Sequence, residues 1–127
     1  GAEIKEAIAK IADIRARSKN VSVAGDRKFN PGFHLAFDLD NMLLVAESTA
    51  KSADLREESR GGHTRDDFPG MSSTWRQVNH ISSFDGTKVT VTARPLPPMP
   101  KELFDLFDVH ELEKYMTPEE IAKGGSN

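Results

Sequence analysis

The sequence of 127 residues contains no cysteine. This absence excludes disulfide bonds, thiolate zinc sites and thiol nucleophiles within the chain, and it fits a reducing compartment. No apolar run approaches the roughly 18 residues that a membrane helix requires, and the N-terminal residues lack the apolar core of a signal peptide. We therefore expect no direct membrane span. Because residue 1 is glycine rather than methionine, we also expect the chain to be processed, tagged or cut from something longer.

The chain also lacks an excess of charge of one sign, since 17 basic residues stand against 20 acidic ones. This balance indicates neither nucleic-acid binding nor an acidic tail. Apolar residues make up 37% of the chain, below the roughly 45–50% of ordinary globular proteins, although that range also counts glycine. Such a composition favours a long-helix or extended fold, or a domain that completes its core against another body.

The motifs of common enzyme sites are missing as well. No G-x-G-x-x-G follows a predicted strand, no G-x-S-x-G frames a serine, and no pair of histidines has zinc-ligand spacing. His34 has no second histidine at ligand spacing, so we do not expect it to bind a metal. No motif therefore frames a catalytic, cofactor-binding or metal-binding residue, and the one candidate constellation is His63 with Arg60 and Arg65.

Two long helices are predicted in the first half. In residues 2–19, isoleucine and alanine recur at the three- and four-residue spacing of an amphipathic helix. Asn30 and Pro31 suit the N-cap and first position of a second helix that runs to about Arg56. The middle of this second helix is apolar most of the way round. We therefore expect it to be covered on several sides, which two helices alone cannot do.

A β-hairpin is predicted in the second half, after a short capped turn of helix that carries Trp75. Residues 76–84 and 87–93 have the composition of strands, and Asp85-Gly86 between them suits a two-residue type I′ turn. Valine alternates with threonine in the second strand. One face of that strand is therefore expected to be buried.

The last third is predicted to be an extended arm followed by short helices. Four prolines between residues 95 and 100 are too many for the interior of a helix or sheet. Short helices are predicted over residues 101–108 and 109–116. Thr117 has the position of an N-cap before a third short helix, and residues 124–127 are expected to fray.

Together these elements predict a mostly α fold, an antiparallel long-helix bundle with a C-terminal β-hairpin and short tail helices. Residues 1–70 form the helical bundle and end in a charged motif. Residues 71–127 form a C-terminal extension that contains the hairpin, the proline arm and the short helices. We expect both parts to belong to one domain.

The densest charge lies where the second helix ends, because nine of the fourteen residues from Asp54 to Asp67 are titratable. Arg60, His63 and Arg65 have the composition of an anion site that could hold a carboxylate. Carboxylates lie close to each arginine in the sequence, however, so structural Arg–carboxylate pairing is favoured over anion binding. The Gly-Gly pair within this stretch permits positive φ or a close approach of another chain.

The segment E-E-S-R-G-G-H-T-R-D-D-F-P at residues 57–69 resembles the motif that closes the helical domain of the flavoprotein subunit of succinate dehydrogenases and fumarate reductases. Residues 20–36 and 40–47 are similar to the helical segment before that motif. W-R-Q-V-N at residues 75–79, the hairpin and K-Y-M-T-P-E-E at residues 114–120 are similar to the C-terminal extension of the bacterial type. Aspartate oxidase and adenylylsulfate reductase share a weaker version of the motif.

The resemblance implies the C-terminal segment of a flavoenzyme that interconverts succinate and fumarate and passes electrons to an iron–sulfur subunit. In that family an upstream domain holds FAD, and the catalytic residues lie there and in a capping domain. This chain would then contribute packing and docking surface without catalysis by itself. Its partners would be the FAD-binding and capping domains and the iron–sulfur subunit, on the cytoplasmic, inner face of the bacterial membrane. The isolated chain could form a homodimer.

The resemblance also assigns a role to the charged motif, which would tie the helical domain to the flavin domain. The residues carried over into this interdomain and structural motif are Glu58, Ser59, Arg60, Gly61, Gly62, His63, Arg65, Asp66, Asp67 and Pro69. The family's helical domain begins one helix earlier, and that helix would cover Ile4, Ile8 and Ile11. The alternative hypotheses are a free-standing carboxylate-binding or protein-interaction module, and the equivalent domain of aspartate oxidase or adenylylsulfate reductase.

Overall fold

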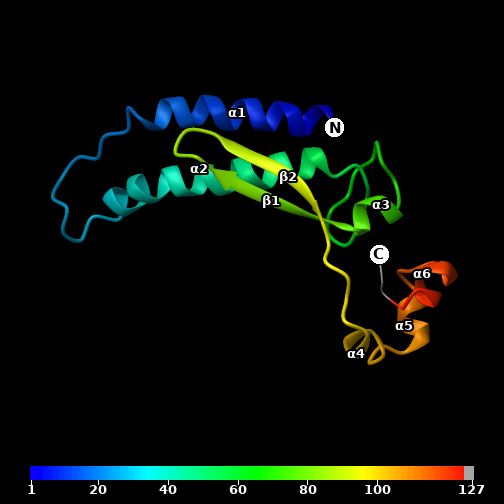
Figure 1. The fold of residues 1–127 in the computed structure, drawn as a ribbon. Coiled ribbons are helices and arrows are strands. Elements are labelled where there is room, and N and C mark those ends of the chain that lie inside the picture. The colour runs from blue at the N-terminus through cyan, green and yellow to red at the C-terminus, as the bar shows by residue number, and fades with distance from the viewer. Residues whose placement is uncertain (125–127) are drawn as a thin grey trace.

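Two long antiparallel helices form the main layer of the protein. The computed structural model describes residues 1–124. Helix α1 (Ala2–Ser18) and helix α2 (Pro31–Leu55) lie side by side and run in opposite directions (Figure 1). Their bounds lie within a residue of the predicted ones. In residues 1–124 the other elements are two strands of seven residues each and four helices of four or five residues. The prediction of a mostly α fold with a hairpin is therefore confirmed.

Helix α2 begins at the predicted cap. The Asn30 side-chain oxygen accepts hydrogen bonds from the backbone N–H of Gly32 at 3.1 Å and of Phe33 at 3.3 Å. Pro31 occupies the first turn, where a missing N–H costs nothing because that group would have no helical partner. The cap fixes the point at which the chain turns back along α1.

A small charge cluster joins the two helices to the hairpin. The Glu47 carboxylate of α2 accepts from Arg15 of α1 at 2.7 Å and from Lys51 at 2.6 Å. The Lys51 ammonium also donates to the backbone oxygen of Val89 at 2.7 Å. One carboxylate and one ammonium therefore connect α1, α2 and the second strand of the hairpin.

The hairpin consists of β1 (Val78–Phe84) and β2 (Val89–Pro95), which pair antiparallel and lie along α2 (Figure 1). Val89 is only 1% exposed, whereas the threonines that alternate with the valines of β2 are exposed. The predicted burial of one face of this strand is confirmed. The buried face packs on α2.

The turn of the hairpin differs from the prediction. Phe84 pairs with Val89, so four residues, 85–88, connect the strands. A type I′ turn requires positive φ at both central residues, but among these four residues only Gly86 has one, at 95°. The Asp85 carboxylate instead accepts hydrogen bonds from the N–H groups two and three residues ahead, each at 2.8 Å. This local side-chain bonding stabilises a four-residue connection that Asp85 begins, and the predicted type I′ turn at Asp85-Gly86 is wrong.

Four short helices lie in the remaining part of residues 1–124. Helix α3 (Ser73–Arg76) is capped by the Ser72 side chain and precedes β1. The tail, which we define as residues 101–124, contains α4 (Lys101–Phe104), α5 (Val109–Glu113) and α6 (Pro118–Ala122). Helices α4 and α5 are shorter than predicted. Figure 1 shows the tail at the end of an extended proline arm, away from α1 and α2.

The tail has its own caps, and within residues 1–124 one ion pair joins it to the end of α3. Thr117 and Glu120 form the capping box of α6, so the predicted helix start is confirmed. The Glu120 carboxylate also accepts a hydrogen bond from the guanidinium of Arg76, at the end of α3. The predicted fraying of residues 124–127 falls largely outside the described residues.

Few large apolar side chains are buried, and in residues 1–124 they are Leu43, Val89 and Phe104. Much of the apolar surface of α2 faces solvent, and Phe37 is 74% exposed. The other large exposed apolar side chains of this helix are Leu35, Met42 and Val45. Helix α1 and the hairpin therefore leave α2 incompletely covered. None of the helices in residues 1–124 is long and apolar enough to cross a membrane.

Candidate functional site

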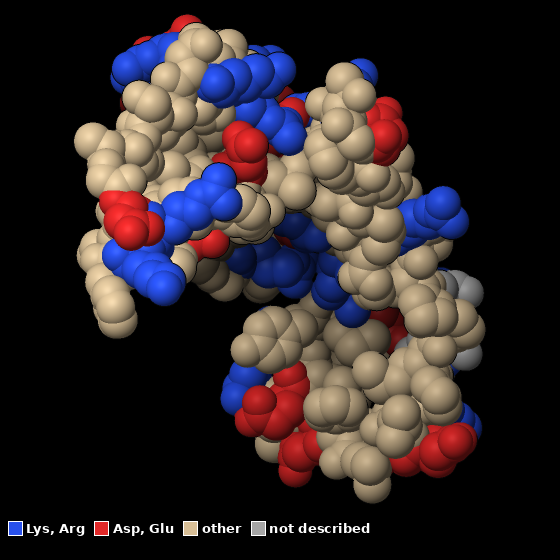
Figure 2. Space-filling model, turned by 90° about the vertical axis from the view of Figure 1, so that its left-hand side faces the viewer, with Lys and Arg blue, Asp and Glu red and all other residues tan. Residues whose placement is uncertain are grey.

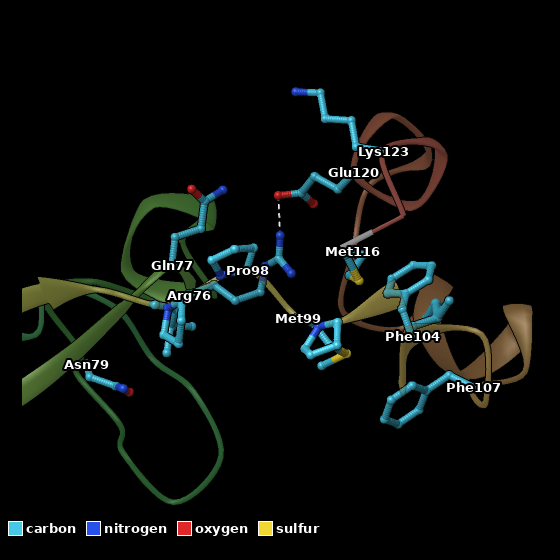
Figure 3. Close-up of a pocket in the computed structure, with 14 residues that line it drawn as sticks. Arg76, Gln77, Asn79, Pro98, Met99, Phe104, Phe107, Met116, Glu120 and Lys123 are labelled. Atoms are coloured by element: carbon cyan, nitrogen blue, oxygen red, sulfur yellow. Dashed lines mark hydrogen bonds and ion pairs between the residues drawn. The ribbon is translucent and has the colours of Figure 1, made fainter. Parts of the chain in front are cut away.

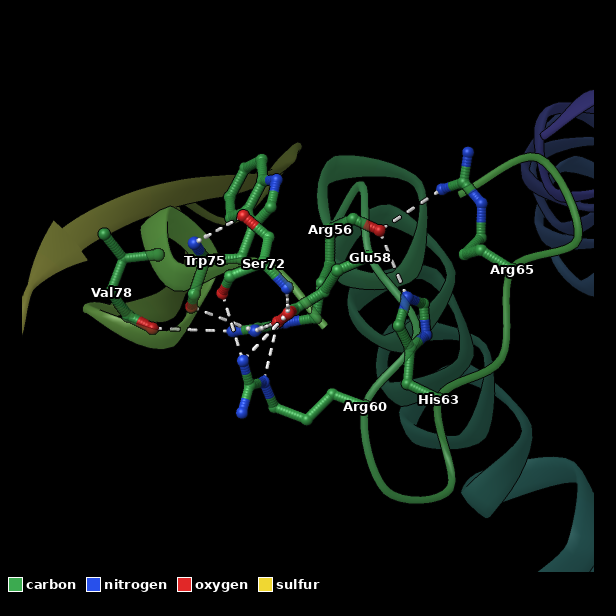
Figure 4. A network of polar contacts seen from close by, with 8 residues as sticks. All are labelled: Arg56, Glu58, Arg60, His63, Arg65, Ser72, Trp75 and Val78. Atoms are coloured by element: carbon green, nitrogen blue, oxygen red, sulfur yellow. Dashed lines mark hydrogen bonds and ion pairs between the residues drawn. The ribbon is translucent and has the colours of Figure 1, made fainter. Parts of the chain in front are cut away.

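The charged motif, residues 56–69, begins where α2 ends. Arg56 has extended backbone angles (φ −82°, ψ 100°) and so terminates the helix. The chain then forms a loop that returns to the end of α2 before it enters α3. Side chains at opposite ends of this loop are therefore brought together around the helix C-terminus (Figure 4).

Glu58 is the centre of the motif, with a side chain that is 1% exposed. Its carboxylate accepts from Arg60 Nε and Nη2 at 3.0 Å each, in a bidentate pair. It also accepts from the guanidinium of Arg56 and, at 2.8 Å, from the backbone N–H of Ser72. Figure 4 shows the two arginines reaching this carboxylate from different sides. The carboxylate of Glu58 thus accepts four hydrogen bonds, about as many as its two oxygens have lone-pair positions.

These hydrogen bonds decide the charge state of Glu58. Burial by itself raises the pKa of a carboxyl group, because it disfavours the charged form. Here the hydrogen bonds from Arg60, from the Ser72 backbone and from Arg56 outweigh burial and lower the pKa of Glu58 from 4.5 to about 2. Glu58 is therefore an ionised structural anchor and a poor proton donor at neutral pH.

The two arginines also bind the chain that follows the motif. Arg60 donates to the backbone oxygen of Ser72 at 3.0 Å. Arg56 donates to the backbone oxygens of Trp75 at 3.1 Å and Val78 at 3.4 Å. The Glu58 cluster consequently fixes the position of α3 and the start of β1 relative to the end of α2.

Arg65 closes the C-terminus of α2. Its guanidinium is almost fully buried and donates from Nη1 to the backbone oxygens of Ala53 at 2.9 Å and Asp54 at 3.1 Å. The last carbonyls of a helix have no helical partner and carry partial negative charge, so a cation here is favourable. Its Nε and Nη2 each donate to the Asp67 carboxylate at 2.7 Å. These hydrogen bonds hold the pKa of Asp67 well below its usual range and raise the pKa of Arg65.

A tight turn at Gly61 and Gly62 places His63. Arg60 and His63 exchange backbone hydrogen bonds at 2.8 and 3.0 Å across this turn. Gly61 has φ of 58°, in the left-handed region that favours glycine. The Nε2 atom of His63 lies 3.1 Å from the backbone oxygen of Arg56, another carbonyl at the end of α2. His63 is thus held by the backbone rather than by a carboxylate.

Ser59 holds the two ends of the loop together. Its hydroxyl lies within hydrogen-bond distance of two acceptors for its one hydrogen, the backbone oxygens of Arg65 at 3.1 Å and Phe68 at 3.0 Å, and it accepts from the Arg65 N–H at 2.8 Å. By contrast, Asp66 and Pro69 are exposed, and within residues 1–124 no ion pair of Asp66 is recorded. Of the motif residues predicted from the sequence, these two stand apart from the cluster.

Two residues near the central carboxylate were not predicted from the sequence. Ser72 and His80 lie beyond the motif, and no spacing signal connects them to Glu58. Arg56, which bonds the central carboxylate, belongs to the stretch of dense charge that the sequence shows, although it stands outside the residues assigned by resemblance. The positions of Ser72 and His80 follow only from the folded loop.

His80 lies beside the cluster on β1, with its ring edge-on to Trp75 at 5.5 Å between centroids. Its Nε2 atom is buried, and it is the one buried side-chain nitrogen or oxygen of residues 1–124 without a hydrogen-bond partner. Burial lowers the pKa of His80, and the charge of Arg56 acts in the same direction. His80 therefore packs as a neutral ring.

The arrangement separates the residues of the hypothetical anion site. Arg60 turns toward Glu58, while Arg65 turns toward Asp67 and the helix carbonyls, with His63 between them (Figure 4). In residues 1–124, no three or more His, Asp or Glu side chains form a group that could hold a metal ion. The geometry supports a structural network that secures a helix end.

The chain matches one protein family over most of its length. A family model described as "Fumarate reductase flavoprotein C-term" matches residues 1–107. One component of the fumarate reductase (CoM/CoB) from Methanothermobacter marburgensis is 34% identical over 58% of this chain and 14% of its own length. An uncharacterised FAD-dependent oxidoreductase of Methanocaldococcus jannaschii is 41% identical over 58% of this chain and 13% of its own length.

A third relative, the succinate dehydrogenase flavoprotein subunit of Rickettsia conorii, is 32% identical over 73% of this chain and 16% of its own length. The chain thus spans between 13% and 16% of the length of these relatives. No solved structure matches it significantly.

Proposed function

The chain belongs to the family of fumarate reductase flavoprotein C-terminal regions, and we propose that the protein it represents interconverts succinate and fumarate with FAD. The names of its relatives support this proposal, since they include an FAD-dependent oxidoreductase and components of a fumarate reductase and of a succinate dehydrogenase. The electrons would pass to an iron–sulfur subunit. The assembly would lie on the cytoplasmic, inner face of the bacterial membrane, which it contacts as a peripheral complex.

The residues of this chain do not fit an FAD site. Dinucleotide phosphates are commonly bound by a glycine-rich turn between a parallel strand and a helix. The two strands of residues 1–124 form an antiparallel hairpin instead, and the guanidiniums of Arg60 and Arg65 already bind Glu58 and Asp67. FAD would therefore be held by another part of the flavoprotein.

The role of this chain within the flavoprotein would be to pack against its FAD-binding and capping domains. The observation that carries this role is the uncovered apolar surface along the first half and middle of α2, a helix whose C-terminal end is held by hydrogen bonds from Arg65. Burial of such a surface stabilises an assembly by roughly 25 cal/mol per Å². Further helices of the flavoprotein would complete the bundle of residues 1–70, with residues 71–127 as an extension of the same domain.

The charged motif would serve this packing by presenting its outer surface to the flavin domain. Its interior bonds are satisfied within the chain, so it can meet a partner without reorganisation. The exposed apolar surface of α2 would also allow two copies of the isolated chain to form a homodimer. Light scattering on the isolated chain would distinguish a monomer from such a dimer.

Calorimetric titration of the chain with succinate and with fumarate tests this proposal against the carboxylate-binding module. We expect no heat of binding at millimolar ligand, because the arginines of the motif are already paired. Binding at millimolar or lower concentration that Arg60→Ala abolishes, and that Arg94→Ala leaves intact, would overturn the structural role. Arg94 is the matched control because it is an exposed arginine outside the motif.

A further inference from the structure

The tail has an excess of negative charge, although the chain as a whole has nearly balanced charge. Residues 101–124 carry seven acidic and three basic side chains, whereas residues 1–100 carry thirteen acidic and fourteen basic ones. The expectation that the chain has no acidic tail is therefore wrong for this region. Figure 2 shows the acidic side chains around the edge of the lower lobe, which is the tail, with uncharged side chains in its middle.

We propose that the tail docks a separate protein, through an amphipathic segment of that protein which carries an apolar face and lysine or arginine side chains. The first support is apolar exposure. Leu106 is 79% exposed, and several neighbours in the tail are about half exposed or more. These neighbours are Leu103, Phe107, Val109 and Tyr115. So much exposed apolar surface in so short a segment is typical of an interaction site.

A hollow beside the tail gives the partner a place to insert. It has a volume of about 550 Å³ and lies between the start of the hairpin and the tail. Gln77 and Asn79 line it on the hairpin side, and Met99, Phe104 and Met116 line it on the other (Figure 3). Apolar side chains of a helix would fit the second wall, while amides can pair with polar groups of the partner.

The charge of the tail selects the chemistry of the partner. Within residues 1–124, no ion pair is recorded for Glu102, and Glu113 contacts only His110, at 3.4 Å on an exposed surface. Acidic side chains around an apolar centre attract a basic partner and repel nucleic acid and anionic lipid. A basic amphipathic protein segment satisfies both the apolar centre and the acidic edge.

The attachment of the tail also suits a docking element. An extended proline arm connects it to β2, and the ion pair of Arg76 with Glu120 bridges the hollow (Figure 3). Helices α5 and α6 lie beyond the residues that the family model matches, 1–107. The proposed docking surface therefore lies in a different part of the chain from the charged motif. If the experiment below disproves this docking, the proposed packing of α2 is not affected.

The experiment uses the full chain and a synthetic helical peptide of about 18 residues, with leucine on one face and lysine on the other. A matched peptide carries glutamate in place of every lysine. Fluorescence anisotropy should show binding of the lysine peptide, weakened at least tenfold when salt is raised from about 50 to 500 mM, and no binding of the glutamate peptide.

Variants locate the site. Phe107→Ser in the tail should weaken binding of the lysine peptide at least tenfold, whereas Phe37→Ser on the exposed face of α2 should not. The double variant Glu102→Lys with Glu113→Lys balances the charge of the tail, with five acidic and five basic side chains, and should weaken binding of the lysine peptide at least tenfold. Circular dichroism confirms that each variant keeps its helices, and chemical-shift mapping on the unaltered chain should place the peptide at residues 99–116.

Three results would overturn the proposal. The first is equal weakening by Phe37→Ser and Phe107→Ser, because the peptide would then bind apolar surface without preference. The second is equal affinity for the lysine and glutamate peptides, which would remove the role of the acidic edge. The third is binding of anionic vesicles by the chain, or a concentration-dependent dimer that Phe107→Ser abolishes, because either would identify another occupant.

Discussion

The charged motif and the tail contain the same kinds of residue and use them differently. In the motif, Glu58 and Arg65 are buried, and each binds several partners, including one that lies more than ten residues away in the chain. In the tail, Lys101 pairs with Asp105 across one helical turn, on side chains that remain more than half exposed. Desolvation and shared partners make a buried pair costly to break, while exposed pairs of neighbours contribute little. The same composition therefore secures the fold in one region and leaves the other free to bind.

The largest effect is expected from Glu58→Ala. This change leaves the guanidiniums of Arg56 and Arg60 without their shared carboxylate, and we expect a loss of about 3–5 kcal/mol in the free energy of unfolding. Chemical denaturation followed by circular dichroism measures it. Glu57→Ala is the matched control, because Glu57 is exposed and its loss should stay within about 0.5 kcal/mol. If the two variants lose equal amounts of free energy of unfolding, the buried charges of the motif are no more important for stability than exposed ones.

The second largest effect is expected from acid, which should lower the free energy of unfolding through protonation of Glu58. The pKa of Glu58 is about 2 in the fold and ordinarily 4.5, so the unfolded chain takes up this proton first as the pH falls. The contribution of Glu58 is therefore complete above pH 4.5 and is lost between about pH 4.5 and 2. It corresponds to about 3 kcal/mol. Unfolding curves over this range should be steeper in pH for the unaltered chain than for Glu58→Gln, and identical slopes would contradict the assignment.

Arg60→Ala should have a smaller effect, because Arg56 still neutralises Glu58. We expect a loss of about 1–3 kcal/mol in the free energy of unfolding, since one bidentate pair and the bond to Ser72 disappear. Thermal or urea unfolding gives the value, with Arg94→Ala as the control. A loss below a few tenths of a kcal/mol would mean that the motif is solvated in the isolated chain.

The smallest effect is expected in the tail. Asp105→Ala removes an exposed pair between residues four apart, and the loss should not exceed about 0.5 kcal/mol. Urea unfolding should give overlapping curves for this variant and the unaltered chain. A loss as large as that of Arg60→Ala would show that the tail, too, depends on its charge pairs for its fold.

Local signals made much of the fold predictable. Asn30 with Pro31, and Thr117 with Glu120, each satisfy the backbone of a helix start within a few residues, so the pattern and the structure agree. The hairpin turn was missed because the Asp85 side chain bonds the backbone ahead of it. Whether Asp85 occupies a two-residue turn or bonds the backbone ahead of it depends on its side-chain geometry, which the Asp-Gly pair alone does not specify.

The interior of the motif was less predictable. Internal pairing could be expected from the alternation of arginines and carboxylates, and the family resemblance singled out Glu58, but the charge pattern alone does not show which of Glu57 and Glu58 is buried. Only the return of the loop to the end of α2 buries Glu58 and leaves Glu57 in solvent. The Ser72 N–H that completes the site lies 14 residues away. Long-range contacts of this kind follow from the tertiary fold and from no local pattern.

The most direct test of the account is the pKa of the Glu58 carboxyl group, measured by carbon-detected NMR titration of the folded chain. A buried carboxylate bound by Arg56 and Arg60 should titrate at about 2. A value at or above 4.5 would contradict the account, because it would mean that burial outweighs the arginines or that the cluster is open to solvent.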